Sequence, residues 1–255
     1  MTRPTQPAYY MRVPRPVAAM AKDFPDGHRI PRDRHPRGQL IYAIAGVMSV
    51  TTPHGTWVVP PQRAVWVPPG TDHESRMHGD VAMRTLYVRA DAARAMPQRC
   101  CVVNVSPLMR ELIVEATRVP LRYDERGRDG RLMRLLLDEL AGSPALPLHL
   151  PQPADKRLKR ICDALLRDPA NAEPLSRWAG RVGASPRTLA RLFQAETGMP
   201  FTIWRQQARL LAALARLAAG EPVTAVALNL GYASPSAFTA MFRRALGAAP
   251  RDYFR

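Results

Sequence analysis

Two stretches near the C-terminal end of the sequence repeat one pattern of residues. The first, ASPRTLARLFQAETGMP, begins at Ala184, and the second, ASPSAFTAMFRRALGAAP, begins at Ala233. The repeat extends upstream, because EPLSRWAGRVG from Glu173 aligns without a gap with EPVTAVALNLG from Glu221. A solenoid needs roughly three or more copies, so two copies about fifty residues apart indicate a small motif that is present twice.

Each copy has the residues of two helices joined by a tight turn. A proline suits the first helical position, where the missing N–H costs nothing, and a small alanine lets a second helix pass closely. A glycine supplies the positive φ of a sharp turn, and Ser-Pro is typical of the next helix start. The pairs are Pro174 and Pro222, Ala179 and Ala227, Gly183 and Gly231, and Ser185 and Ser234. The sequence therefore predicts two helix-turn-helix motifs.

The second helix of each copy is expected to have one buried face and one exposed face. The predicted buried positions are Leu189, Leu192 and Phe193 in the first copy, and Phe238, Met241 and Phe242 in the second. On the outward side of the first copy, Arg187 and Arg191 lie one turn apart, which suits guanine edges or phosphate. The second copy offers small side chains there, which fit thymine methyl groups or docking on the DNA backbone. These small side chains are Ser236, Ala237 and Ala240.

A long helix is predicted between the two copies, over about residues 201–219. Its expected buried stripe is Ile203, Trp204, Ala208, Leu211 and Leu214, and Gly220 is a natural end. A helix of about eighteen residues is about 27 Å long, enough to hold two reading helices on one face of DNA.

The composition favours a polyanionic partner. The chain has 37 Lys and Arg against 21 Asp and Glu, a formal net charge of +16 and a pI of about 11.0. Such a charge favours nucleic acid over a membrane surface. The three cysteines offer no spaced disulfide framework, and the sequence shows neither a signal-peptide core nor an apolar stretch of spanning length. We therefore expect a cytoplasmic protein without a membrane partner.

The N-terminal half of the chain has a different residue pattern. Residues 39–89 alternate β-branched and aromatic runs with turn signals at TPHG, PPQ, PPGTDH and MHGD, which predicts successive antiparallel strands. Helices are expected in SPLMRELIVEAT and RDGRLMRLLLDELAG, and the proline-rich SPALPLHLPQPAD is expected to be an extended linker. The apolar stripe of the second helix suits either a partner helix or packing against the strands.

Residues 155–255 resemble the DNA-binding domain of the AraC/XylS family of transcription regulators. The resemblance rests on two helix-turn-helix units bridged by a long helix, and on GYASPSAFTAMFRRALGAAPRDYFR with its closing Gly, Pro and Tyr. It implies a first unit over about 174–194, a linker helix over about 201–219 and a second unit over about 222–244. It also implies that both second helices bind adjacent major grooves of double-stranded DNA. The implied DNA-contacting residues are Ser185, Arg187, Thr188, Arg191, Ser234, Ser236, Thr239, Ala240 and Arg243.

The strand region is similar to the two cupin motifs. Asp33, His35, Gln39 and Gly46 lie where the first motif has His, His, Glu and Gly, and Pro68, Gly70 and His73 match Pro-x-Gly-x-x-His of the second. Asp33 and Gln39 thus replace two ligands of a full cupin metal site, and a neutral amide is a weak metal ligand. We therefore favour a metal-free interior that binds a small effector. The large side chains expected to face this interior are Tyr42, Ile44, Trp57, Trp66 and Tyr87. The alternative is a divalent metal held by His35 and His73, with Asp33 or Gln39 completing the set.

Together these patterns predict a two-domain protein of mixed class. An all-β cupin-like sensor barrel over 1–104 is followed by helices and a proline-rich linker over 105–154, and an all-α DNA-binding domain occupies 155–255. The expected function is a sequence-specific transcription regulator, not an enzyme, that needs no cofactor and responds to an unidentified small-molecule or metal effector. The resemblance implies a homodimer, with RNA polymerase as a further partner. The alternative function is a cupin-type metalloenzyme with an accessory helical domain.

Overall fold

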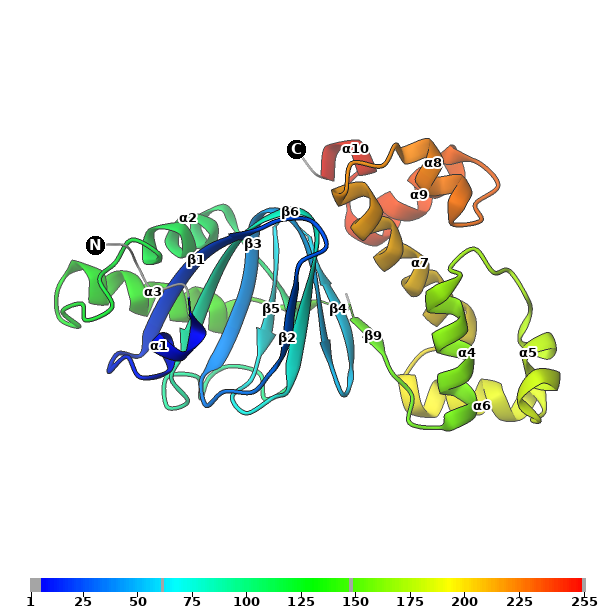
Figure 1. Cartoon of the computed structure of the whole chain (residues 1–255), viewed down its shortest axis with the longest axis horizontal. Coiled ribbons are helices and arrows are strands. Elements are labelled where there is room, and N and C mark those ends of the chain that lie inside the picture. The colour runs from blue at the N-terminus through cyan, green and yellow to red at the C-terminus, as the bar shows by residue number, and fades with distance from the viewer. Residues whose placement is uncertain (1–5, 61, 147–148, 254–255) are drawn as a thin grey trace. The chain divides into compact units, whose positions relative to one another are not determined.

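The computed structural model describes residues 6–60, 62–146 and 149–253, which form two compact units. The first unit ends before His149, and the second begins at His149 and includes the short segment Pro53–Thr56. The first is rich in strands and the second is helical, as the predicted two-domain layout requires (Figure 1).

The first unit combines an antiparallel sheet with helices. The strand order is β1-β6-β3-β5-β7-β8, with β2 paired to β6 and β4 paired to β3. The strands are β1 (Val17–Phe24), β2 (Arg29–Asp33), β3 (Gly38–Thr52), β4 (Gly55–Val59), β5 (Arg63–Val67), β6 (His73–Val88), β7 (Cys101–Asn104) and β8 (Ala145–Leu146). The helices are α1 (Pro7–Met11), α2 (Pro107–Ala116) and α3 (Arg128–Gly142).

The pairing of β3 with β6 separates two environments. Leu40 lies opposite Leu86, and both belong to an apolar cluster that includes α2 and α3. The next pair, Gln39 opposite Tyr87, lines a cavity. Since successive side chains of a strand point to opposite faces, the helices cover one face of the sheet and the cavity lies on the other.

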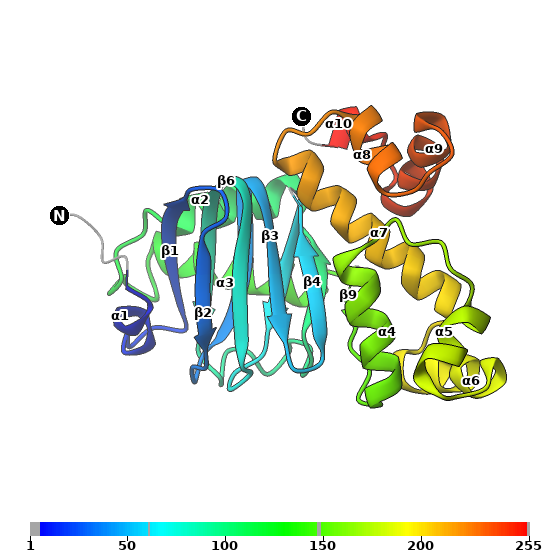
Figure 2. The ribbon, with the colours of Figure 1, turned by 45° about the vertical axis from the view of Figure 1, so that its right-hand side comes forward.

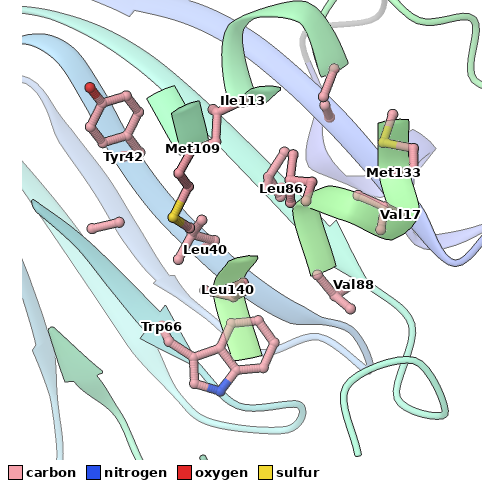
Figure 3. Close-up of a cluster of buried hydrophobic side chains, with 14 of the residues drawn as sticks. Val17, Leu40, Tyr42, Trp66, Leu86, Val88, Met109, Ile113, Met133 and Leu140 are labelled. Carbon is pink, nitrogen blue, oxygen red and sulfur yellow. The ribbon is translucent and has the colours of Figure 1, made fainter. Parts of the chain in front are cut away.

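The core of the first unit lies between the sheet and the helices α2 and α3 (Figure 3). It contains Leu136 and Leu140 of α3, so the apolar stripe of this helix packs against the strands, while Leu135 on the same helix is 43% exposed. Each fully buried leucine stabilises the fold by about 1.5–3 kcal/mol. The other main members are Val17, Tyr42, Trp66, Leu86, Val88, Met109, Ile113 and Met133.

One predicted turn, at MHGD, is wrong. Residues 77–80 lie inside the continuous strand β6, and the register with β3 shifts between Ala43 and Val47. Gly46 has φ +78 there, and a Cβ on it would lie 2.4 Å from the carbonyl oxygen of Asp80. Gly46 and Gly79 thus mark an irregularity in the pairing of β3 with β6 and not a reversal of the chain. Strands β1, β2, β7 and β8 lie outside residues 39–89, where strands are predicted, and β8 lies in the segment predicted to be an extended linker.

The second unit is built along the long helix α7 (Phe201–Ala218), which has α4 to α6 at one end and α8 to α10 at the other (Figures 1 and 2). Trp204 is buried, as predicted, and its Nε1 donates to the carbonyl oxygen of Pro151 at 2.9 Å. Ile203, predicted to be buried, is 50% exposed. The other elements are β9 (His149–Pro151), α4 (Lys156–Arg167), α5 (Leu175–Val182), α6 (Pro186–Thr197), α8 (Val223–Asn229), α9 (Pro235–Leu246) and α10 (Pro250–Tyr253).

Candidate nucleic-acid interface and candidate effector pocket

The helical pairs α5–α6 and α8–α9 have the geometry of two helix-turn-helix motifs. Gly183 ends α5 in the left-handed conformation at φ +67, and Gly231 follows α8 at φ +75. The prediction for Pro174 and Pro222 is wrong by one position, because each is the extended N-cap residue and the helix begins after it. The turns themselves lie where the sequence repeat predicts them.

The predicted serine caps and small packing residues are confirmed. Ser185 accepts a hydrogen bond from the backbone N–H of Thr188, and Ser234 accepts one from that of Ala237, both at 3.1 Å. In each case a proline occupies the next position. Ala179 and Ala227 are buried where α5 and α8 pack. Both second helices therefore begin at a well-defined residue.

The outward face of α6 carries two unpaired cations. Arg187 and Arg191 are exposed, and within the described part of the chain neither forms an ion pair or a hydrogen bond through its side chain. By contrast, Arg181 of α5 donates from Nη1 and Nη2 to the two carboxylate oxygens of Glu173, both at 2.6 Å. Thr188 is half-buried, with its hydroxyl 2.9 Å from that of Ser185. The buried side of α6 has Leu189 and Phe193 as predicted, whereas Leu192 is half-buried.

The outward face of α9 borders a groove of about 520 Å³. Ser236, Ala240 and Arg243 are exposed in its wall, Thr239 is half-buried beside them, and the N-cap Ser234 is also half-buried. Phe238, Met241 and Phe242 form the buried side, as predicted. The groove is also lined by residues of α8 and α10 that no sequence pattern marks as functional. These residues are Val223, Thr224, Pro250, Arg251 and Asp252.

The predicted effector residues meet at one cavity of about 180 Å³ in the first unit. Its lining contains His35, Gln39 and His73, which are buried, and Asp33, which is exposed at the end of β2. His28, which the sequence analysis left without a role, also lines it. The apolar walls are Met20, Phe24, Ile30, Ile41 and Met83. Tyr42 and Trp66, expected to face the interior, instead belong to the core beneath α2 and α3.

Two histidines of the cavity face one amide. The Nε2 atoms of His35 and His73 lie 3.0 and 2.9 Å from the side-chain amide of Gln39. The two Nδ1 atoms lie 2.6 and 2.9 Å from backbone carbonyl oxygens, of Arg37 and Thr71. A carbonyl can only accept, so each Nδ1 carries the proton.

The amide of Gln39 also connects the two rings to β6. Its Nε2 donates to the hydroxyl of Thr85 at 2.9 Å, and that hydroxyl donates its one hydrogen to the carbonyl oxygen of Leu40, also at 2.9 Å. Its Oε1 is the atom that faces both rings. Burial lowers the pKa of His73, which favours its neutral ring.

The donor set of the cavity is a poor fit for a resident metal. Both Nε2 atoms face the neutral amide of Gln39, which is a weak ligand for a divalent cation. Asp33 accepts from the backbone N–H of Arg34 at 2.7 Å. Among residues 6–60, 62–146 and 149–253, no three His, Cys, Asp or Glu side chains converge as a metal site would require. The chemistry of these residues is that of a hydrogen-bonded pocket wall.

Known proteins match both units. Residues 19–178 match the AraC-like ligand binding domain, and residues 178–255 match a helix-turn-helix domain. The HTH-type transcriptional regulator NimR of Escherichia coli is 37% identical over 223 residues, which is 88% of this chain and 81% of that protein. The Arabinose operon regulatory protein of Escherichia coli is 25% identical over 236 residues, 90% of this chain and 70% of that protein. RipA of Corynebacterium glutamicum is 35% identical over 103 residues, 40% of this chain and 31% of that protein.

A pair of capped helix-turn-helix motifs and a lined cavity on a separate unit define a ligand-responsive DNA-binding regulator. The chain belongs to the AraC family of HTH-type transcriptional regulators. It is thus a DNA-binding transcription regulator with an N-terminal ligand-binding domain, and the metalloenzyme alternative is not supported. Of the helices in the described ranges, none combines the length and apolarity needed to cross a membrane.

Proposed function

We propose that the protein recognises a specific double-stranded operator with α6 and α9 in adjacent major grooves. The observation that carries this proposal is the matched pair of capped helices, each with a buried apolar side and an exposed side that carries arginine. A linker helix of α7's length, about 27 Å, supports reading heads on neighbouring turns of one DNA face.

The residues of α6 and α9 divide into two roles. Arg187 and Arg191 read base edges, because their guanidinium groups are free to donate to guanine O6 and N7. Ser236, Thr239 and Ala240 make shorter contacts from α9. Residues at the helix starts and on the side of α9 contact the phosphates of the DNA backbone. The residues in this second role are Ser185, Thr188, Ser234 and Arg243.

Salt dependence tests this interface. The full chain, titrated with a mixed-sequence duplex, should show log K falling linearly with log salt concentration, as counterions leave the phosphates. Replacing Arg243, which is assigned to phosphate, with Ala should reduce the slope. A matched control is Arg110→Ala in α2, which removes an exposed arginine that is paired with Glu111 outside the DNA-binding unit. Equal slopes for Arg243→Ala and the control would contradict the assignment.

The cavity of the first unit is proposed as a metal-free effector pocket inside a cupin-like barrel. Support comes from its mixed lining, with apolar walls and a few hydrogen-bonding groups that can orient a small molecule. His35, Gln39, His73 and Asp33 supply the polar contacts, and no cofactor takes part. Metal analysis of the purified protein tests this, and one equivalent of tightly bound metal would contradict it.

The remaining assignments concern assembly and organisation. The family suggests a homodimer, and exposed Leu108 and Leu135 on α2 and α3 support a contact through the helical segment 105–154. A Leu135→Lys variant should then be monomeric by light scattering while the unchanged chain is dimeric. We also assign the sensor domain to residues 1–104 and the DNA-binding domain to residues 155–255. We further propose RNA polymerase as a partner, a cytoplasmic location and no enzymatic activity.

A further inference from the structure

One arginine of α7 joins the two helix-turn-helix motifs to each other. Arg209 donates from Nε to the carbonyl oxygen of Pro169 at 2.7 Å. Its Nη2 donates to the carbonyl oxygens of Ala170 and Asn171, at 3.0 and 3.2 Å. Residues 169–171, here the bridging loop, connect α4 to α5 and so lead directly into the first motif. One planar group thereby fixes three consecutive carbonyls of that loop.

The same guanidinium contacts the second motif. It lies 5.9 Å from the centre of the ring of Tyr232, in the turn between α8 and α9. Tyr232 packs in turn against Phe238 of α9, edge to face with centroids 5.3 Å apart. Phe238 is fully buried in the core of the second motif. Arg209 is therefore one contact away from the core of the second recognition helix.

The turn of the second motif also packs against the bridging loop, beside Arg209. Gly231, in the turn of the second motif, approaches the bridging loop so closely that a Cβ on it would lie 2.8 Å from the carbonyl oxygen of Ala170. One turn earlier on α7, Arg205 donates to the carbonyl oxygen of Glu173 at 3.0 Å. Two successive turns of α7 thus hold the segment that leads into α5, and the second motif's turn packs on the same segment.

Charge pairing does not explain this arrangement. Within the described ranges, Arg209 contacts three neutral carbonyls and a ring, and Glu173, the nearby carboxylate, is engaged by Arg181. A planar fork that spans several acceptors fixes orientation more tightly than a single ammonium group can. The contacts of Arg209 are therefore suited to fixing the orientation of the second motif relative to the bridging loop.

We propose that Arg209 is a positioning residue that sets the spacing at which α6 and α9 meet DNA, without touching DNA itself. This inference rests on the proposed two-groove binding. Its consequence is that the protein discriminates operators by the number of base pairs between the two contacted blocks, because a rigid pair of reading heads fits only one separation. A variant that lacks the Arg209 contacts can also bind operators whose two contacted blocks are one base pair closer together or further apart.

The test uses the full chain and a duplex that the unchanged protein selects from a random pool. Derivatives of this duplex have one base pair inserted or deleted between the two contacted blocks. The unchanged protein should bind both derivatives at least about tenfold more weakly than the parent. Arg209→Gln should bind the parent about five- to tenfold more weakly, yet separate parent from derivatives by less than about threefold.

Arg216→Gln is the matched control, since it removes the same charge from the same helix and breaks a pair with Glu221 that lies within the approach to the second motif. It should keep the spacing profile of the unchanged protein. Arg209→Lys keeps the charge and stem but not the fork, so it should relax spacing as Arg209→Gln does. If the circular dichroism of Arg209→Gln shows loss of helix, Arg209→Lys decides by the same criteria.

The outcomes separate this inference from the proposed function. If the unchanged protein selects no sequence, two-groove binding itself fails. If it selects a sequence but tolerates every spacing, or if the Arg209 variant that decides the test keeps the full spacing discrimination, the role of Arg209 is refuted while DNA recognition stands.

Discussion

Ser185 and Ser234 cap the two recognition helices with the same hydrogen bond. Each hydroxyl accepts from the backbone N–H three residues later, at 3.1 Å, and each serine precedes a proline. The repeat in the sequence is therefore a repeat of local chemistry. It satisfies one of the backbone donors that a helix start leaves unpaired, and it holds each helix at a defined first residue.

Removing either cap should lower stability. Ser185→Ala and Ser234→Ala should each lower the free energy of unfolding by about 1 kcal/mol, because the N–H of Thr188 or Ala237 loses its acceptor. Urea unfolding followed by circular dichroism measures the loss. Ser236→Ala, inside α9 and exposed, is the control and should leave stability unchanged within about 0.5 kcal/mol. Caps that cost no more than this control would argue against the role of the serines.

The two arginines of α6 should act on specificity as well as affinity. Arg187→Ala and Arg191→Ala should each weaken binding to the selected operator by about 1–3 kcal/mol and relax preference at one base position. Competition binding against operators with single base changes measures both effects. A uniform loss across all base changes would indicate phosphate contact instead of base reading.

A single substitution should turn the effector pocket into a metal site. The Nε2 atoms of His35 and His73 lie 3.0 and 2.9 Å from the amide of Gln39. Two ligands of a tetrahedral zinc ion, each about 2.1 Å from it, are about 3.4 Å apart, so these atoms need to move by only about 0.5 Å. Gln39→Glu should therefore bind about one zinc per chain, while the unchanged protein binds none stoichiometrically. Adding His73→Ala to that variant should abolish the binding, and zinc that persists would place the site elsewhere.

His73 should make stability fall in mild acid. Burial lowers its pKa in the folded state below the ordinary 6.5, although Asp33 and Asp72 act in the opposite direction. The unfolded chain therefore takes up this proton first as pH falls through about 6.5. The stabilisation is fully present above that pH and is lost as pH falls toward the lower folded-state value. One proton contributes a slope of at most about 1.4 kcal/mol per pH unit.

Urea unfolding between pH 7.5 and 5.5 measures this slope. His78 has a pKa lowered by burial as well, so some slope should persist without His73. His73→Gln should nevertheless show a smaller slope than the unchanged protein. An identical slope in both proteins would mean that His73 does not take part.

The sequence predicts those features that a few adjacent residues decide. The left-handed turns need Gly183 and Gly231, and the helix starts need Ser185 and Ser234, so reading these residues in order was enough to locate both motifs. In these cases the backbone requirement and the residue type coincide at one position. The cupin resemblance likewise named His35, Gln39 and His73, which line one cavity, but it did not predict that both rings face the amide of Gln39.

The failures arise where distant partners decide. Ile203 fits the helical stripe of α7, yet the phase of the stripe is set by the helices that pack on α7, and its side chain is half exposed. Tyr42 has the parity opposite to Gln39, so the face that the helices cover determines that it lies in the core. Gly79 resembles a turn signal, but its strand partner across the sheet extends the ladder past it. No local pattern contains this information.

Selection from a random DNA pool by the full chain tests the central claim most directly. Two recognition helices on one linker should enrich sequences with two preferred blocks whose centres lie about one helical turn, roughly 10 base pairs, apart. Replacing Arg187 and Arg191 should erase the preference in one block and leave the other. Enrichment of a single block, or of no sequence, would contradict the account.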